Sequence, residues 1–534
     1  MQATGLTTTD LIIAIVYVFG IIGIGIYFSK QHKSPKDFLL AGRSMGWLPV
    51  GLSLMATLTS AVGYMSFPAG AFKGGLILLW MAMAIPLSFP VVVYVFMPFY
   101  HKLRVYTAYE YLERRFNDKV RALTSIIFIL WRVTWMAAVI YVPSYVLTTV
   151  SDGAIPLVPS IIVLGLIATA NTTMGGIKAV MWGDVVHSTV MFASMIIAII
   201  LVISAVPGGF TEIWDTLTAA GKTKMTGTMP GFEEASLWGQ IKLYLITDFT
   251  VLSLIITYTV QKMGNYCVDQ AMVQRYLTAR SLSQSQKGFA ANAGAYLLYV
   301  FLVTTIGAGL FAVTKHFVFP EALKVDQIFP YFIANFMPIG LTGVMVAAIY
   351  GASLSSFDSG INSCATAILN DFYGRYKLKI YNLESGNISA EEHKRRLKIA
   401  RISTVIIGLL VTFLALFVGF LGDIFIYSQK LINMFTGPLF GVFVLAMFTK
   451  RATAPAVLIA GFIGFVMGSL MVFAKKWGID ELAVGVLWPA AISFVITVVL
   501  GYLLSYVLGE NTDESHNYTR SAVMANEKLN GITK

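Results

Sequence analysis

The sequence predicts an all-α polytopic membrane protein, and three observations support this fold class. Of the 534 residues, 57% are hydrophobic and only 12% are charged, a balance that soluble globular proteins do not have. The apolar residues gather in runs of about 20 residues, the length of a membrane-spanning helix. The basic residues fall mainly in alternate short connections between these runs, as is typical of cytoplasmic loops.

The apolar runs predict thirteen transmembrane helices. The connections that hold most Lys and Arg residues should face the cytoplasm, which places the N-terminus outside and the C-terminus inside. We expect a plasma membrane location, of the bacterial inner-membrane type. The helices are expected at residues 10–29, 46–72, 74–99, 120–150, 157–174, 179–206, 248–274, 288–314, 338–372, 398–420, 424–449, 453–475 and 484–508.

Several classes of function are disfavoured. The net charge of +11 is spread over short loops and forms no basic face, so no nucleic-acid partner is expected. Cys267 and Cys364 lie within or beside predicted spans, which supports neither a disulfide framework nor a thiolate metal site. The histidines are scattered without metal-ligand spacing, so the protein is not expected to be an enzyme.

Three polar segments lie between or after the predicted spans. Residues 208–236 predict an outer loop, and residues 509–534 predict a disordered inner tail. A membrane solute sensor is the alternative of another class, but it would need a signalling domain larger than this tail. Residues 107–116 (TAYEYLERRF) predict an amphipathic helix on the membrane surface.

The segment 347–363 carries a polar stripe inside a long apolar run. An Asp near mid-membrane, here Asp358, costs about 2.5–3.5 kcal/mol on insertion scales and therefore needs a partner. A cation is the simplest partner. Five small residues share one helical face beside Asp358: Ala352, Ser355, Ser356, Ser359 and Ser363.

Two other spans carry Gly, Pro and small polar residues at mid-depth. These are residues 53–68 in the second span and residues 264–270 in the seventh. Interrupted helices at matching places in two halves indicate an inverted-repeat transporter with its site at the repeat interface. The alternative is that the small residues serve helix packing. Carbonyls freed where a helix unwinds, together with hydroxyls, are the usual ligands of Na⁺ in transporters.

At this point the sequence resembles the sodium:solute symporter family over nearly the whole chain up to about residue 508. The resemblance rests on the order and spacing of several motifs, together with the 347–363 segment. They are DFLLAGR at 37–43, TAYEYLERRF at 107–116, GGIKAVMWGD at 175–184, VQRYLTARS at 273–281 and GPLFG at 437–441.

The resemblance implies a LeuT-like fold, a 5+5 inverted repeat with one extra N-terminal and two extra C-terminal helices. The chain would then divide into an N-terminal helix and inner loop (1–45), a first repeat (46–206), an outer loop (207–247), a second repeat (248–449), two C-terminal helices (450–508) and a cytoplasmic tail (509–534). The implied activity is Na⁺-coupled symport by alternating access, with Na⁺ as the only cofactor and no obligate protein partner.

The family's ion sites carry over by position. The common sodium site, Na2, falls on Ala56, Thr59, Ala352, Ser355 and Ser356. A second cation site, or the path by which Na⁺ leaves, falls on Asp184, Asp358 and Ser359. Asp358 replaces a serine of two-sodium relatives, which would strengthen such a site or bind a proton. The alternative for Asp184 is a salt bridge to Lys178.

The substrate is a small organic solute whose contacts match the family less well. The residues that contact sugar in the family's sugar carriers correspond here to Gly63 and Leu58. Two cations, Arg132 and Lys430, would suit a carboxylate if they reach the cavity. The alternatives are that Arg132 extends to the inner headgroups or pairs with an acid, and that Lys430 reaches the outer surface to meet Asp423. The candidate substrate residues are Ser60, Gly63, Arg132, Trp135, Asn265, Tyr266, Tyr296 and Lys430.

An organic anion, such as a monocarboxylate, is the favoured solute, because of Arg132, Lys430 and the apolar replacements at the sugar-contacting positions. A sugar or polyol is the alternative, because residues 266–270 (YCVDQ) resemble the corresponding turn of animal glucose cotransporters.

Overall fold

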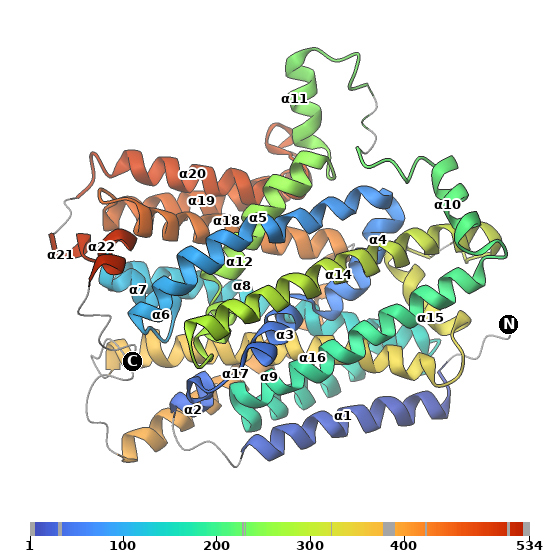
Figure 1. Cartoon of the computed structure of the whole chain (residues 1–534), viewed down its shortest axis with the longest axis horizontal. Helices are drawn as coiled ribbons and strands as arrows, with labels where there is room; N and C mark the ends of the chain where they lie inside the picture. Colours follow the sequence, from blue (N-terminus) through green and yellow to red (C-terminus); the bar gives the residue numbers. More distant parts are fainter. Residues whose placement is uncertain are drawn as a thin grey trace.

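The computed structural model describes residues 6–29, 35–226, 229, 231–321, 323–377, 390–421, 424–509 and 513–526. Within these ranges every regular element is a helix, apart from one isolated bridge between Met45 and Ala279. Most long helices lie side by side along the long axis of the molecule, and α11 projects from the bundle (Figure 1).

The α-helices, in chain order, are α1 Thr8–Ser29, α2 Pro35–Leu40, α3 Trp47–Leu58, α4 Ala61–Gly74, α5 Ala84–Val91, α6 Met97–Leu103, α7 Ala108–Arg115, α8 Asp118–Val150, α9 Leu157–Ala205, α10 Gly209–Ala219, α11 Leu237–Ile246, α12 Tyr258–Val268, α13 Gln270–Leu277, α14 Leu282–His316, α15 Ile328–Phe336, α16 Leu341–Ala367, α17 Ala390–Ala415, α18 Ile424–Phe448, α19 Ala454–Trp477, α20 Trp488–Leu504, α21 Asp513–His516 and α22 Arg520–Ala525. The 3₁₀ and π segments are η1 Ala41–Arg43, η2 Gly75–Met83, η3 Val92–Phe96, η4 Ser253–Thr257, η5 Val325–Gln327, η6 Ile368–Lys377, η7 Val418–Leu421 and η8 Asp480–Leu482.

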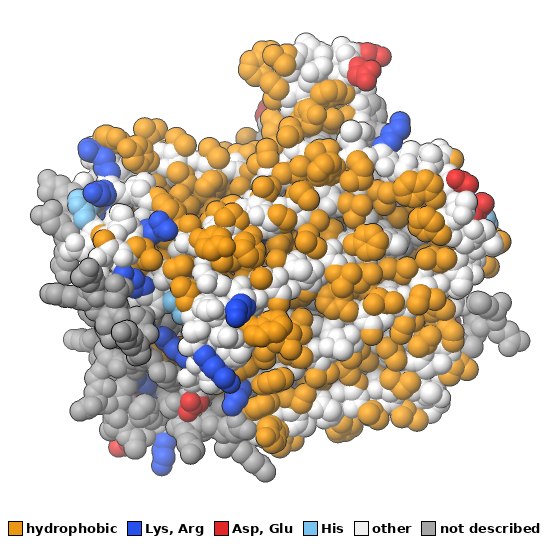
Figure 2. Space-filling view, viewed as in Figure 1, with side chains coloured by type: hydrophobic (Ala, Val, Ile, Leu, Met, Phe, Trp, Pro, Cys, Tyr) orange, Lys and Arg blue, Asp and Glu red, His pale blue; other side chains and the backbone are white. Residues whose placement is uncertain are grey.

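In the described ranges, nine helical stretches are long and apolar enough to cross a membrane, and two shorter apolar helices accompany them. Some stretches are longer than one span: α9 has 49 residues and contains a kink at Gly176, where φ is 56°. Glycine adopts this positive φ without a steric cost. Apolar side chains cover most of the face seen in Figure 2, and Lys and Arg gather mainly at its left end. The membrane-spanning class is confirmed.

Both predicted helix interruptions are present. α3 ends at Leu58, Thr59 and Ser60 are non-helical, and α4 begins at Ala61. The second interruption separates α12 from α13 by one extended residue, Asp269, with φ −72° and ψ 119°. Backbone carbonyls and amides at such breaks lose their helical partners and become available to side chains or ligands.

The polar stripe of the 347–363 segment lies on α16, in the interior of the bundle. α16 packs against α1, α8 and α9, and nearly all of its side chains are buried. Small side chains permit this close approach of helices. The polar groups of the stripe therefore face protein and not lipid.

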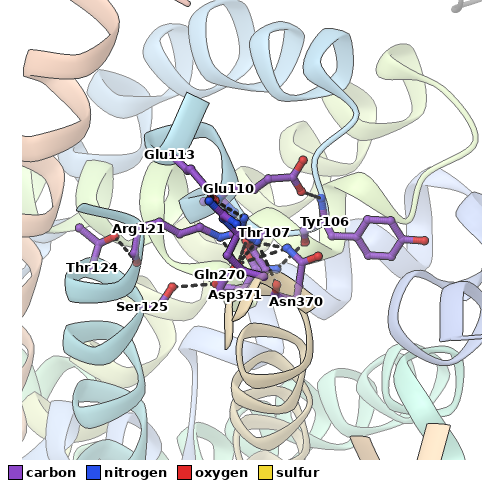
Figure 3. A network of polar contacts seen from close by, with 12 residues as sticks. Tyr106, Thr107, Glu110, Glu113, Arg121, Thr124, Ser125, Gln270, Asn370 and Asp371 are labelled. Atoms are coloured by element: carbon purple, nitrogen blue, oxygen red, sulfur yellow. Dashed lines mark hydrogen bonds and ion pairs between the residues drawn. The ribbon is translucent and has the colours of Figure 1, made fainter. Parts of the chain in front are cut away.

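Residues 107–116 contain the predicted helix, α7, but its expected location on the membrane surface is wrong. Nearly all side chains of α7 are buried, and Glu113 pairs with Arg121 of α8 and Arg375 of η6. Arg121 of α8 joins Glu113 and Asp371, each with an N–O separation of 2.7 Å, and Figure 3 shows these side chains converging. Burial raises the pKa of the Glu110 carboxyl above its usual range, and the nearby Arg114 opposes this shift.

The prediction of a disordered tail is wrong for residues 513–526, which include α21 and α22. Met524 accepts a hydrogen bond from Lys102 Nζ at 2.7 Å, and Ser515 accepts one from Arg115 at 3.1 Å. Val523 is buried. These contacts attach the segment to α6 and α7, which a composition-based prediction does not detect.

Candidate functional site

The interruption between α3 and α4 lies against the serine stripe of α16. Ser356 Oγ donates to the carbonyl oxygens of Thr57 at 3.2 Å and Ala56 at 3.4 Å. Thr59 Oγ1 donates to the Met55 carbonyl at 2.8 Å, at the end of α3. The structure thus places two Na2 candidates, Ala56 and Ser356, in direct contact. Ala352 and Ser355 are buried on the same stripe.

A second polar cluster joins α3, α9, α13 and α16. Asp184 accepts a hydrogen bond from Ser53 at 2.5 Å and pairs with Arg275, with an N–O separation of 3.5 Å. Arg275 also donates to Ser53 Oγ at 2.8 Å and contacts Ser359. The Ser355 hydroxyl lies beside the Asp184 carboxylate. Asp184 and Ser359 are therefore brought together by Arg275, which lies one residue beyond the predicted span 248–274.

Asp358 belongs to a separate contact group on the other edge of the stripe. Its carboxylate accepts from Asn171 Nδ2 at 2.8 Å and from the hydroxyl of Thr172, both on the first half of α9. Asp184 and Ser359 thus lie together as expected, but Asp358 does not join them. It points in a different direction from α16 and contacts Asn171 and Thr172 of α9.

A central cavity opens beside the α3–α4 interruption and extends to α12. Its walls include Thr59, and they come from α3, α4, α8, α12, α14 and α18. Both aromatic rings and polar groups line it, which suits a small polar solute. Five predicted substrate residues line it: Gly63, Arg132, Trp135, Asn265 and Tyr296.

Three predicted substrate residues lie elsewhere. Ser60 is buried at the start of α4, and the Tyr266 hydroxyl accepts from Asn292 at 3.2 Å. Lys430 lines a separate pocket with Asp248 and Lys475. Its neighbours Ser428 and Gln429 face the central cavity. Successive residues of a helix point about 100° apart, so Lys430 points away. Its suggested partner, residue 423, lies outside the described residues.

Arg132 reaches the cavity wall but is already paired. It forms an ion pair with Asp269, and its Nε donates to Asp269 Oδ1 at 3.1 Å. Asp269 is the extended residue between α12 and α13, and it also accepts from the Ala271 amide at 2.9 Å. Of the alternatives for Arg132, pairing with an acid is the one observed. The sequence indicated that Arg132 would pair with an acid, because charges buried in a membrane protein usually pair.

The cavity also contains polar residues that the sequence analysis did not single out. Gln261, Lys262, Ser428 and Gln429 line it. Gln261 Nε2 donates to Asn433 at 2.7 Å. A lysine and a glutamine inside the predicted span 248–274 were a usable signal, because such residues are rare in spans that face only lipid.

The model of the sodium:solute symporter family matches residues 38–464. The chain belongs to the sodium:solute symporter family. The sodium/sialic acid symporter NanT of Aliivibrio fischeri is 29% identical, over 96% of this chain and 95% of that protein. The sodium/glucose cotransporter of Vibrio parahaemolyticus is 28% identical, over 85% of this chain and 83% of that protein.

A solved structure agrees with this assignment. It is the substrate-bound, outward-open state of a Na⁺-coupled sialic acid symporter, with a TM-score of 0.81 and 26% identity over 95% of this chain and 99% of that chain. These relatives are transporters and not enzymes. Sodium is therefore supported as the coupling ion, and the named solutes differ among the relatives.

Proposed function

We propose that this chain is a secondary active symporter that imports a small organic anion together with Na⁺ by alternating access. One observation carries the proposal: the cavity adjoins a helix interruption whose freed carbonyls meet the buried serines of α16. Ion and solute sites that share one helix break can each favour the same conformation, and such differential binding is the origin of coupling.

The coupling Na⁺ is assigned to Ala56, Thr59, Ala352, Ser355 and Ser356. The contact of Ser356 with the carbonyls of residues 56 and 57 supports this assignment. Carbonyl and hydroxyl oxygens are hard ligands of the kind Na⁺ prefers in broken-helix transporters. A second cation site, or an exit path, is assigned to Asp184 and Ser359, with Asp358 as a neighbouring carboxylate.

The finer architecture is part of the same proposal. It comprises thirteen spans, a 5+5 inverted repeat at residues 46–206 and 248–449, and flanking segments 1–45, 207–247, 450–508 and 509–534. The matching breaks after α3 and α12 support the repeat. The concentration of basic side chains at one end of the molecule (Figure 2) supports a cytoplasmic location for that end. The bacterial relatives support an inner-membrane setting.

A Na⁺/sugar or polyol symporter is the second candidate. The observation that favours it is a set of buried cavity oxygens without a hydrogen-bond partner among the described residues, on Ser66, Asn265 and Tyr299. Such atoms would be satisfied by the several hydroxyls of a sugar or polyol.

A thermal-shift screen of purified protein tests the function. We expect monocarboxylates or sugar acids to raise the melting temperature in Na⁺ and to have little effect when K⁺ replaces Na⁺, because binding to the folded state stabilises it. Stabilisation by neutral sugars alone would favour the second candidate. Equal stabilisation in Na⁺ and K⁺ would contradict Na⁺-coupled binding.

A further inference from the structure

The central cavity contains two buried cations with different surroundings. Arg132 is neutralised by Asp269. Lys262 of α12, which is 5% exposed, has no acidic partner within the described part of the chain. Its Nζ lies 4.4 Å from the centre of the Tyr296 ring and 5.1 Å from that of Tyr258. Both rings also line the cavity.

Aromatic rings attract an ammonium through their electron-rich faces. This attraction is weaker than the cost of removing a charge from water, which in protein interiors is normally met by an opposite charge. The tyrosines therefore hold the Lys262 side chain in position without neutralising it. An anion entering the cavity would supply the missing partner.

The groups around Lys262 can hold the remainder of such a solute. Asn265 lies one helical turn further along α12, and its Oδ1 is buried without a hydrogen-bond partner in the described structure. The hydroxyl oxygens of Ser66 and Tyr299, from α4 and α14, are buried and lack a partner in the same way. Three separate helices thus present polar atoms to the cavity.

We propose that Lys262 is the specificity-determining residue of the cavity and that it binds the carboxylate of the transported solute, whereas Arg132 has a structural role with Asp269. This inference rests on the proposed function. It assigns the anionic end of the solute to α12, directly before the Asp269 interruption. Because Lys262 lies on α12, carboxylate binding would favour one position of α12 relative to α13.

The test uses the full-length protein in proteoliposomes and measures Na⁺-driven uptake of labelled lactate, gluconate, N-acetylneuraminate and glucose. Lys262→Met keeps the length of the side chain and removes its charge. We expect it to raise the KM for the transported acid at least tenfold, as for loss of a hydrogen bond to a charged group. Lys262→Arg should stay within about threefold of wild type, since it keeps the charge.

The matched control is Lys315→Gln. Lys315 also lies over an aromatic ring, 5.3 Å from the centre of Phe311, but it does not line the cavity, and its variant should keep the wild-type KM. Folding of each variant is checked by its Na⁺-induced rise in melting temperature, which Lys262→Met should retain.

The possible results distinguish failure of the role of Lys262 from failure of the proposed symporter function. Na⁺-driven uptake of an acid with an unchanged KM in Lys262→Met would overturn the role of Lys262 and leave the symporter assignment intact. Na⁺-driven uptake of glucose and of none of the acids would overturn the carboxylate-binding role and favour the sugar symporter. Acid uptake that is independent of Na⁺ in the wild type would instead contradict the proposed coupling.

Discussion

The ion pair between Arg132 and Asp269 gives a sharp prediction about the second helix interruption. Asp269→Asn removes the negative charge but keeps the shape of the side chain. An Asn carbonyl oxygen can still accept from the Ala271 amide, as Asp269 does at 2.9 Å. The substitution therefore isolates the loss of charge from the loss of the cap at the start of α13.

The magnitude follows from burial. Arg132 is 2% exposed and Asp269 is fully buried, so the variant leaves a buried arginine without its counter-charge. Breaking a buried pair in this way costs about 3–5 kcal/mol, equivalent to about 150- to 5,000-fold in the folding equilibrium. The double variant Arg132→Met, Asp269→Asn leaves no isolated charge and should recover most of this loss, because replacing a whole buried pair is often close to neutral.

The assay is the apparent melting temperature of purified protein in detergent, measured by intrinsic fluorescence. Asp269→Asn should melt well below wild type, and the double variant should melt above Asp269→Asn. Asp215→Asn, at an exposed position on α10, is the control and should match wild type. An Asp269→Asn protein as stable as wild type, or a double variant less stable than Asp269→Asn, would refute the pairing argument.

Three further predictions concern the ion sites and the inner ion pairs. Ser356→Ala and Thr59→Ala should each weaken Na⁺ binding about tenfold, as for loss of one oxygen contact to a charged group, in Na⁺ titrations of melting temperature; unchanged titrations in both would remove them from the sodium site. Asp184→Asn should lower the Hill slope for Na⁺ in uptake assays, and an unaltered slope would limit Asp184 to its pairing with Arg275. Arg121→Gln should lose about 3–5 kcal/mol of stability, because Glu113 and Asp371 keep buried charges; a wild-type melting temperature would contradict this.

The helix interruptions were predictable because they depend on local chemistry. Gly, Ser and Thr at mid-depth weaken a helix where a lipid-facing span would be uniformly apolar, and α3 ends beside Thr59 as the pattern indicated. The burial of α16 followed similarly from its serines and Asp358, which are too polar to face lipid. Both arguments used only residues within one segment of the chain.

The partners of buried charges were harder to predict, because they come from distant segments. Arg275 lies one residue beyond the predicted span 248–274, yet it is fully buried against Asp184. Arg132 and Asp269 are 137 positions apart, and only the fold brings them together. Lys430 was a candidate for the cavity because it is a cation on a predicted span, but it lines another pocket. The pattern alone does not show which face of the helix a side chain occupies.

The central claim is that solute entry is driven by Na⁺, and uptake into proteoliposomes tests it most directly. Vesicles with the purified protein are given labelled lactate, gluconate or N-acetylneuraminate with an inward Na⁺ gradient, and parallel vesicles receive K⁺ in its place. The account predicts transient accumulation of at least one acid above its external concentration only with the Na⁺ gradient. Equal uptake of the transported acid under both conditions would contradict it.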